Sequence, residues 1–524
     1  MGITTTMKTP PMPHQGAELV SHGADRIRGV WWEQGLGKTW LAIAEAEGLY
    51  QTGFVDGLLV LAPNGIHENW ALYELPPHLG VPYRCHIYNT HKAQTKAAQR
   101  DAQEVLTYRT GLAVLVMSYD GIKTETGKAL AKKFLTQRRV FYVLDESNRI
   151  KTPSAIVTRT VLASGKYADF RRVLCGTPIT NTPFDVYTQV KFLDPTFWDR
   201  TPYGLGSFAA FKAFFGVWED GYNGKTKQEY KVLKSYRNLD LLKTLLEPLV
   251  TRLLKEDVLT LPPKVYSYRG FDMTPKQQRL YDELEADFMT MLGDELIMAP
   301  LAITRMLRLQ QITCGYLPTA AAAPAGPQPA DDYSLFTGLE APAPVPAQPV
   351  PDGQKFMPID DHNPRLDLLR EICEDLPHKA IIWARFRADI DQIVTALGDR
   401  CTRWDGSIPL DRREVNKRRF LEDPACQFMA ATPESMGEGH TLVVAKTEVY
   451  YSNSFKLKER LQSEDRAHRI GTDTPVHIID IVANSSLDLR IVAALRNKFD
   501  IASSLIDKKF RSWLLTYEPS LATI

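Results

Sequence analysis

The chain has 524 residues, of which 44% are hydrophobic and 24% are charged, a composition typical of a globular protein with two or three domains. Lysine and arginine number 63 against 62 aspartates and glutamates, so the net charge alone does not attract the chain to nucleic acid or to an anionic membrane. The six cysteines form no CxxC pair, and no apolar run approaches about 18 residues, so we expect a reducing compartment and no membrane partner.

Short apolar runs alternate with helix-length segments over the first half of the chain. They include GVWW, GLLVLAP, LAVLVMSY, RRVFYVLDE and FRRVLCGT. Such runs, each followed by a helix, predict βα units and a parallel sheet covered on both faces. The alternation restarts after Asp361, with KAIIWAR, CQFMAAT and TPVHIIDIV among its strands. We therefore predict an α/β fold with two parallel-sheet lobes in tandem and helical insertions between them.

The sequence between the two lobes has a different composition. TPKQQRLYDELEADFMTMLGDEL and LAITRMLRLQQITCGYL carry apolar residues at three- and four-residue spacing, which predicts amphipathic helices, the first beginning after Thr274. An alanine- and proline-rich stretch follows that cannot build a core, and we expect it to be disordered. The predicted domains are an N-terminal ATP-binding lobe, a helical bridge, this insertion and a C-terminal lobe, at residues 1–255, 256–316, 317–358 and 359–524.

A candidate phosphate-binding loop lies between the strand GVWW and the helical stretch WLAIAEAEGLY. The strict loop pattern begins with glycine, where this chain has Trp32. The phosphates are bound by the last turn of such a loop, through backbone N–H groups, a helix N-terminus and a lysine. The residues that supply this turn are Gly35, Leu36, Gly37, Lys38 and Thr39. We expect the loop to bind a nucleotide despite Trp32.

Two adjacent acids end a later apolar strand, FYVLDE. A nucleotide triphosphatase needs a carboxylate to hold Mg²⁺ and a second one to orient or deprotonate the attacking water. Asp145 and Glu146 fit these roles, with the Thr39 hydroxyl as a further magnesium ligand. We therefore expect ATP and Mg²⁺ as cofactors, with Lys38, Asp145 and Glu146 as catalytic residues.

The order of further motifs resembles that of Swi/Snf-type DNA translocases, a branch of the superfamily-two helicases. DESNRIKTPSA is similar to the acidic motif of that family, and LCGTPITNTPFDVYTQVKFLDP to its third motif. In the second half, TPESMGEGHTL and RLQSEDRAHRIGTDTPVHIIDIVANSSLD resemble its fifth and sixth motifs. The resemblance covers about Pro13 to Leu495 and implies that both lobes are RecA-like. Because the resemblance extends over nearly the whole chain, we expect a compact bacterial or phage-like member of the family. The expected location is the cytosol of a bacterium or of an infected host, or a nucleus if the source is eukaryotic.

The resemblance also implies roles for residues outside the loop and the acids. Arg466 and Arg469 are three apart on an expected helix, so both guanidinium groups would share one face, and they would stabilise charge on the transferring phosphoryl group. Gln15 is similar to the glutamine with which the family reads adenine, and Gly437 is expected to contact the nucleotide. Contacts to the DNA backbone, which position without reading sequence, are expected from Asn64, Trp70, Ser118, Arg385 and Thr432.

The favoured function is an ATPase, stimulated by double-stranded DNA, that translocates on duplex DNA and remodels DNA or protein–DNA complexes. The expected partners are double-stranded or branched DNA and a targeting protein, and the chain is expected to act as a monomer. Two alternatives remain: a conventional strand-separating DNA or RNA helicase, and an ATP-gated recruitment module with weak hydrolysis. Asn148 motivates the second, because the family commonly has histidine there; asparagine can still donate a hydrogen bond to the neighbouring motif but carries no proton.

Overall fold

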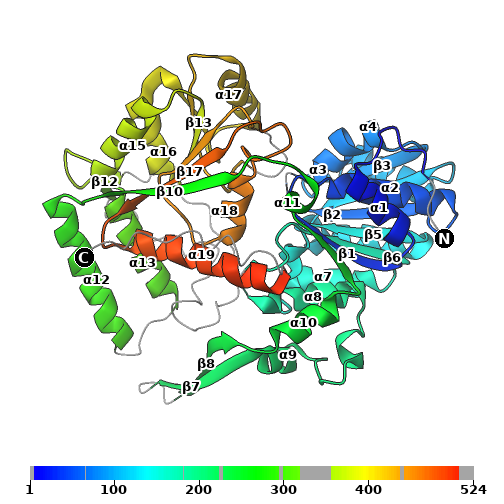
Figure 1. Ribbon diagram of the computed structural model, residues 1–524. Helices are drawn as coiled ribbons and strands as arrows, with labels where there is room; N and C mark the ends of the chain where they lie inside the picture. The colour runs from blue at the N-terminus through cyan, green and yellow to red at the C-terminus, as the bar shows by residue number, and fades with distance from the viewer. Residues whose placement is uncertain are drawn as a thin grey trace. The chain divides into compact units, whose positions relative to one another are not determined.

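The computed structural model describes residues 5–64, 66–180, 182–223, 228–293, 299–318, 356–436 and 442–506 (Figure 1). The predicted insertion 317–358 falls outside these ranges except at its two ends, where β11 (Tyr316–Pro318) pairs antiparallel with β12 (Phe356–Pro358). Within the described ranges, none of the helices combines the length and the apolar character that a membrane crossing requires.

The first sheet has seven strands in the order β3-β4-β2-β5-β6-β1-β9, and its neighbours pair in parallel. The strands are β1 (Ile27–Trp32), β2 (Gly57–Ala62), β3 (Tyr83–Tyr88), β4 (Leu112–Ser118), β5 (Val140–Asp145), β6 (Phe170–Leu174) and β9 (Val250–Leu253). Strands β2, β4 and β5 are buried along their whole length, which explains why they are continuous apolar runs rather than alternating ones. Because the strands are parallel, their carboxyl ends share one edge, and the segments that follow β1, β2, β4, β5 and β6 meet there.

Helices cover both faces of the first sheet. Phe141 and Val143 of β5 share a core with Leu41 of α2 on one face, whereas Tyr142 meets Phe192 of α8 on the other, with ring centroids 5.2 Å apart. The longer helices of this part are α1 (Pro13–His22), α2 (Lys38–Gln51), α5 (Lys96–Thr107), α6 (Glu125–Gln137), α7 (Ile156–Gly165), α8 (Val186–Leu193), α9 (Phe208–Phe215) and α10 (Leu239–Leu246). Shorter ones are α3 (His67–Asn69), the π-helical turn Trp70–Glu74, α4 (Leu75–His78) and α11 (Lys255–Val258).

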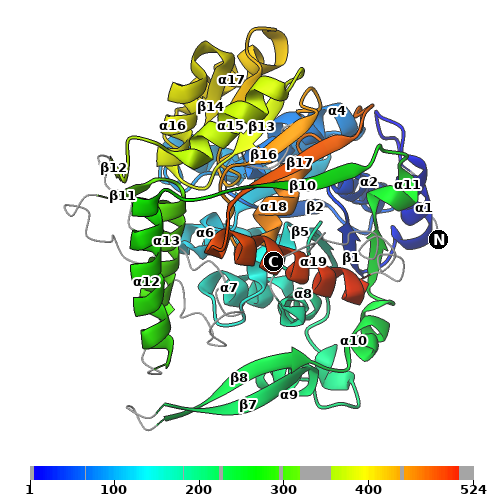
Figure 2. The same cartoon turned by 60° about the vertical axis from the view of Figure 1, so that its left-hand side comes forward.

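The second sheet has six parallel strands in the order β10-β17-β16-β13-β15-β14 (Figure 2). They are β10 (Lys264–Phe271), β13 (Ala380–Trp383), β14 (Cys401–Trp404), β15 (Phe428–Ala431), β16 (Thr447–Tyr450) and β17 (Val476–Ala483). Alternate residues of β13 enter different cores: Ile382 packs in one, and Ile381 and Trp383 pack in the other. The helices around this sheet are α15 (Pro364–Asp375), α16 (Arg387–Leu397), α17 (Leu410–Glu422), α18 (Leu457–Glu464) and α19 (Leu487–Ile506). Two RecA-like parallel sheets flanked by helices are thus confirmed.

The range 256–316, predicted as a helical bridge, contains the two expected helices and one strand. The helices are α12 (Pro275–Gly293) and α13 (Ala299–Thr313). The helix start predicted at Thr274 is confirmed, because its hydroxyl accepts a hydrogen bond from Gln277 N at 3.2 Å and the Gln277 side chain accepts one from Thr274 N at 2.9 Å. The strand β10 of this range joins the second sheet beside β17.

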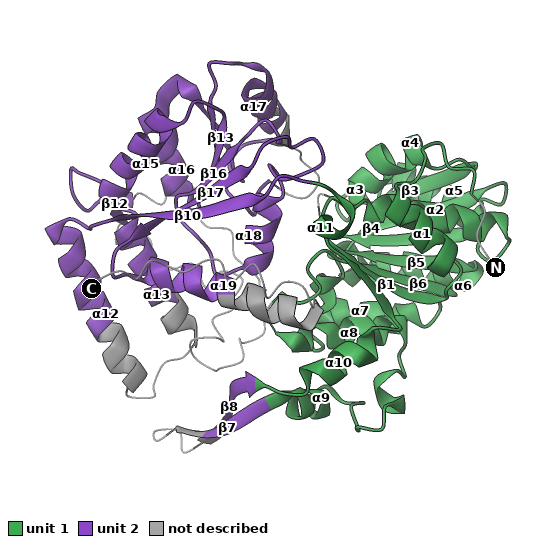
Figure 3. Ribbon diagram, viewed as in Figure 1, with its two compact units in different colours: residues 1–216, 236–260, 501–524 green, residues 217–235, 261–500 purple. Residues whose placement is uncertain are grey.

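The chain divides into two compact units, each built on one sheet (Figure 3). The first comprises residues 1–216, 236–260 and 501–524, and the second comprises residues 217–235 and 261–500. Residues 217–235 belong to a hairpin of β7 (Gly216–Asn223) and β8 (Gln228–Tyr236). The domain limits given above stay predictions.

Candidate active site

The predicted phosphate-binding loop joins β1 to α2. Gly35 and Gly37 have φ values of 81° and 72°, in the left-handed region that glycine adopts at little cost. A β-carbon at Gly37 would also lie 2.1 Å from Gln15 Nε2, so no side chain fits there without displacing that amide. The Trp32 side chain lies apart from this turn, since it is buried and meets the His14 ring edge-on, with centroids 5.3 Å apart. The strict glycine is therefore not required for the loop to reach its fold.

Lys38 opens α2 and folds back over the loop. Its ammonium donates to the carbonyl oxygens of Trp32 at 3.0 Å and Glu33 at 3.3 Å. Both acceptors are neutral backbone groups, whereas hydrogen bonds to a charged acceptor are roughly twice as strong. An incoming phosphate can therefore replace these partners, and the α2 N-terminus beside them favours negative charge.

Gln15 lies against the same loop. Its side chain is buried, donates to Gly37 O at 3.1 Å and accepts from Met12 N at 2.7 Å. The amide therefore ties α1 to the phosphate-binding turn. Adenine reading by Gln15 stays a prediction.

Asp145 and Glu146 end β5 at the edge of the sheet that carries the loop. Burial, together with the neighbouring Glu146, raises the pKa of Asp145 to about 6, although the Trp70 hydrogen bond and the Lys38 charge act to lower it. The Trp70 indole N–H donates to Asp145 Oδ2 at 2.9 Å. Glu146 is buried and adopts φ 51°, ψ 54°, a left-handed conformation that is uncommon for residues other than glycine and is enriched at functional sites.

Asn148 connects the acidic motif to the segment after β6. Its amide donates to Glu146 Oε2 at 3.3 Å and to Thr177 O at 3.2 Å. The expectation that asparagine still donates to the neighbouring motif is confirmed. It also reaches back to the predicted base, so one side chain links Glu146 to the turn at Thr177.

The side chains at this end of the sheet include oxygen donors that suit Mg²⁺. Within the described residues, no group of three or more histidine, cysteine, aspartate or glutamate side chains could hold a metal ion. Asp145 offers a hard carboxylate oxygen, and Thr39 lies in the first turn of α2. This fits magnesium, which usually binds one or two protein ligands and takes the rest from phosphates and water.

In the second unit, the prediction that Arg466 and Arg469 share a helix face is wrong. Helix α18 ends at Glu464, and both arginines lie in the turns that follow it. Beyond the helix, the Arg466 carbonyl accepts a hydrogen bond from Leu442 N at 2.8 Å. The Arg466 side chain is buried, whereas Arg469 is partly exposed.

Arg460, on α18 itself, was missed by sequence reasoning. Its guanidinium donates to Asp480, Asn453 and Glu464 and lies 3.4 Å from the centroid of the Tyr450 ring. Glu464 lies one turn further along α18 and could be paired with Arg460 from the sequence, whereas Asn453, Asp480 and Tyr450 come from other strands and loops that no local signal links to Arg460. The cluster anchors the sixth-motif segment to β16 and β17.

The predicted DNA-contact residues of the first unit have different exposures. Asn64 is exposed after β2. The assignment of Trp70 and Ser118 to backbone contacts is not supported, because both side chains are buried and already bonded: Trp70 to Asp145, and Ser118 Oγ to Gly121 N at 2.9 Å. These two residues therefore make buried hydrogen bonds near the carboxyl ends of the strands.

The remaining predicted residues lie in the second unit. Arg385 is half-buried and donates to Gln310 Oε1, and burial lowers its pKa to about 10. The Thr432 hydroxyl is also half-buried and donates to Ser435 Oγ at 2.6 Å. Gly437 lies outside the described residues.

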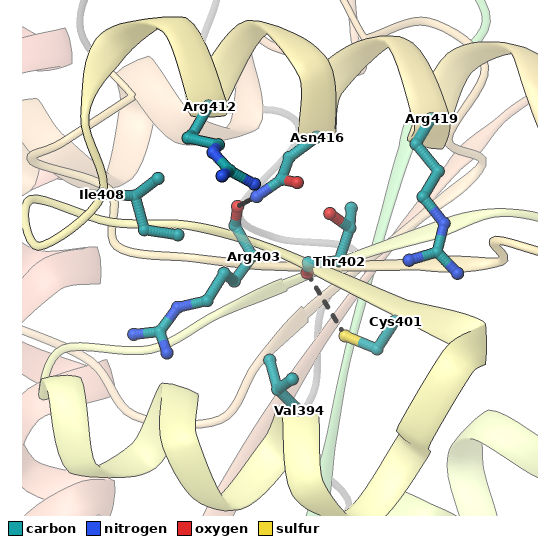
Figure 4. A pocket seen from close by; sticks show the side chains of 8 residues that line it. All are labelled: Val394, Cys401, Thr402, Arg403, Ile408, Arg412, Asn416 and Arg419. Carbon is teal, nitrogen blue, oxygen red and sulfur yellow. Dashed lines mark hydrogen bonds between the residues drawn. The ribbon is translucent and has the colours of Figure 1, made fainter.

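A separate pocket of about 400 Å³ opens in the second unit between α16, β14 and α17 (Figure 4). Arg412, Asn416 and Arg419 line it from one side of α17, and the Asn416 amide donates to Arg403 O at 2.9 Å. The Arg403 guanidinium is held by the Asp405 and Asp391 carboxylates. None of the predicted catalytic or nucleotide-binding residues lines this pocket.

The loop, lysine and paired acids on a RecA-like sheet define a P-loop ATPase site. Residues 32–315 match the SNF2-related domain family, and residues 364–471 match the helicase conserved C-terminal domain. The chain therefore belongs to the SNF2-related family of helicase-like ATPases.

Curated relatives are much longer than the matched region. The TATA-binding protein-associated factor MOT1 of Saccharomyces cerevisiae is 27% identical over 77% of this chain and 22% of its own length. The mouse chromodomain-helicase-DNA-binding protein 1-like is 23% identical over 96% of this chain and 52% of its own length. The mouse DNA annealing helicase and endonuclease ZRANB3 is 26% identical over 91% of this chain and 38% of its own length. The chain thus spans between about a fifth and a half of these relatives.

Among solved structures, the Sulfolobus solfataricus SWI2/SNF2 ATPase core in complex with dsDNA covers 98% of this chain, at 19% identity and a TM-score of 0.40. The same comparison covers 96% of that chain.

Proposed function

We propose that this SNF2-family ATPase hydrolyses ATP in response to double-stranded DNA and uses the energy to translocate along the duplex without separating its strands. The observation that carries the proposal is the convergence of Lys38, Asp145 and Glu146 at one sheet edge in a chain that also matches the helicase C-terminal domain. The proposed partners are duplex or branched DNA and a targeting protein. The proposed setting is a monomer in a bacterial or phage-infected cytosol, or in a nucleus if the source is eukaryotic.

In the proposed reaction, Lys38 exchanges its backbone acceptors for the terminal phosphate oxygens. Its charge stabilises those oxygens more strongly in a site that excludes water than it would in water. Asp145 and Thr39 would hold Mg²⁺, which neutralises charge on the phosphates. Glu146, kept in place by Asn148, orients or deprotonates the attacking water. Arg466 and Arg469 supply further positive charge during phosphoryl transfer.

The proposal is tested by ATP hydrolysis rates with duplex DNA, forked DNA, single-stranded DNA and RNA, together with a triplex-displacement assay for movement. We expect duplex DNA to raise the rate most and the third strand to be displaced only in the presence of ATP. The Glu146→Gln variant is the control, since it keeps the site and loses the base. A rise with single strands or RNA, and none with duplex DNA, would favour a conventional strand-separating helicase instead.

Asn148, at a position where the family commonly has histidine, is the observation behind the second candidate, an ATP-gated recruitment module with weak hydrolysis. That function predicts ATP-dependent DNA binding with hydrolysis near background, and a large gain in turnover for Asn148→His. The motor function predicts substantial turnover in the unaltered protein and a change of less than about threefold for Asn148→His, since the asparagine already holds Glu146.

A further inference from the structure

Two segments that follow neighbouring strands reach Asp145 by hydrogen bonds. The π-helical turn Trp70–Glu74 follows β2 and places the Trp70 indole N–H 2.9 Å from Asp145 Oδ2. Tyr119 follows β4 and donates its hydroxyl to the Asp145 carbonyl oxygen at 2.8 Å. One bond holds the carboxylate of Asp145 and the other holds its backbone.

Both contacts are buried and specific. Trp70 and Tyr119 are 1% and 5% exposed, so neither bond competes with bulk water. The indole N–H is a donor only, and its one bond occupies a single oxygen of the carboxylate. Because a carboxylate rotates about its terminal torsion with little restriction, this bond selects the orientation in which Asp145 presents its other oxygen.

The outer side of the Trp70 turn is open to solvent. Leu72 and Tyr73, on the same turn, are 54% and 68% exposed, and Asn64, earlier in the same connection, is exposed. The turn therefore has an exposed surface that a ligand could contact, at Leu72 and Tyr73, and a buried side chain, Trp70, that is hydrogen-bonded to Asp145. π-Helical turns of this kind are frequent at functional sites.

We propose that Trp70, supported by Tyr119, is a positioning residue for the magnesium-binding carboxylate, and that a contact on the outer surface of its turn alters magnesium binding at Asp145. The inference rests on the proposed function for magnesium at Asp145 and for DNA as the ligand of that surface. The outer partners of metal ligands fix their orientation, and their removal typically lowers metal affinity by about 10- to 100-fold.

The chain offers matched controls for both side chains. Trp70→Phe removes the N–H and part of a buried ring, and Trp31→Phe removes the same atoms at a position whose indole nitrogen, among the described residues, has no hydrogen-bond partner. Tyr119→Phe removes only a hydroxyl, and Tyr142→Phe does the same where the hydroxyl bonds Ser164 Oγ instead. Comparison within each pair separates the bond to Asp145 from loss of volume and from any loss of stability.

The first experiment measures binding of a fluorescent, non-hydrolysable ATP analogue as a function of Mg²⁺, without DNA. We expect Trp70→Phe to need about tenfold more Mg²⁺ than Trp31→Phe, with affinity in EDTA unchanged, and Tyr119→Phe to show a smaller shift than Trp70→Phe but a larger one than Tyr142→Phe. Equal magnesium dependence of Trp70→Phe and Trp31→Phe would overturn the positioning role.

The second experiment repeats the titration with duplex DNA. We expect DNA to lower the Mg²⁺ requirement of the unaltered protein and of Trp31→Phe, but not that of Trp70→Phe. An equal response of Trp70→Phe, or no response in the unaltered protein, would overturn the coupling. If duplex DNA did not stimulate ATP hydrolysis by the unaltered protein, the proposed function alone would be contradicted. The role of Trp70 is tested separately, by the titration without DNA.

Discussion

Two cations, one in each unit, have partners of opposite kinds. In the first unit, the hydrogen bonds that the Lys38 ammonium makes within the described residues go to two backbone carbonyls, at 3.0 and 3.3 Å. In the second, Arg460 is matched by the carboxylates of Asp480 and Glu464 and lies over the Tyr450 ring. A cation with neutral partners can exchange them for a ligand, whereas a cation matched by carboxylates is part of the scaffold. The nature of the partners thus separates a binding group from a structural one.

The largest expected effect is on activity in the first unit. Lys38→Ala should lower ATP hydrolysis by at least about 10³-fold, because it removes a charge directed at the phosphates. The free energy of unfolding should change by less than about 1 kcal/mol, since the hydrogen bonds that are lost go to neutral carbonyls. A phosphate-release assay and urea unfolding on the same variant measure both. A loss of stability as large as that of a core substitution would show that Lys38 is a structural cation like Arg460.

Arg469→Ala tests the partly exposed arginine of the sixth-motif segment. We expect DNA-stimulated turnover to fall by about 10³-fold, at the lower end of the range for arginine groups that stabilise phosphoryl transfer. Binding of a non-hydrolysable ATP analogue should stay close to that of the unaltered protein. Turnover that survives the substitution would contradict the assigned role.

Arg460→Leu tests the scaffold side of the comparison. Removing Arg460 leaves the buried Asp480 carboxylate without its cation, whereas Glu464 keeps Lys264 at 3.0 Å. The second unit should therefore lose about 3–5 kcal/mol of stability. Arg418→Leu, at an exposed position on α17, is the matched control and should change stability by less than about 0.5 kcal/mol. Equal unfolding midpoints in urea for the two variants would show that the cluster is not a scaffold.

The smallest expected effect concerns the pH dependence of stability. Burial raises the pKa of Glu448 to about 8, and its Oε1 atom is buried without a hydrogen-bond partner among the described residues. Because the folded pKa exceeds the unfolded one, this group stabilises the fold fully below about pH 4.5 and loses that contribution as the pH rises through 8. Glu448→Gln should therefore flatten the fall in thermal midpoint between pH 5 and pH 8. An unchanged slope would contradict the burial of a neutral carboxyl group at neutral pH.

Much of the fold follows from local patterns. Runs such as GLLVLA could be predicted as strands because a parallel sheet buries both of their faces, and the loop and paired acids follow from the chemistry that phosphate and magnesium demand. The turn that carries Arg466 could not be predicted from RLQSEDRAHR alone, and its backbone bonds to Leu442, a residue 24 positions earlier. Trp70 was assigned to the surface because nothing in APNGIHENW shows that its indole turns inward to Asp145. Buried polar pairs of this kind are set by tertiary packing.

The central claim is that the loop and paired acids form a working ATPase site controlled by duplex DNA. The most direct measurement follows ATP binding and ATP hydrolysis in Glu146→Gln beside the unaltered protein, each with and without duplex DNA. We predict that the variant binds ATP as tightly as the unaltered protein and shows no hydrolysis that DNA can stimulate. DNA-stimulated hydrolysis by the variant at the rate of the unaltered protein would contradict the account.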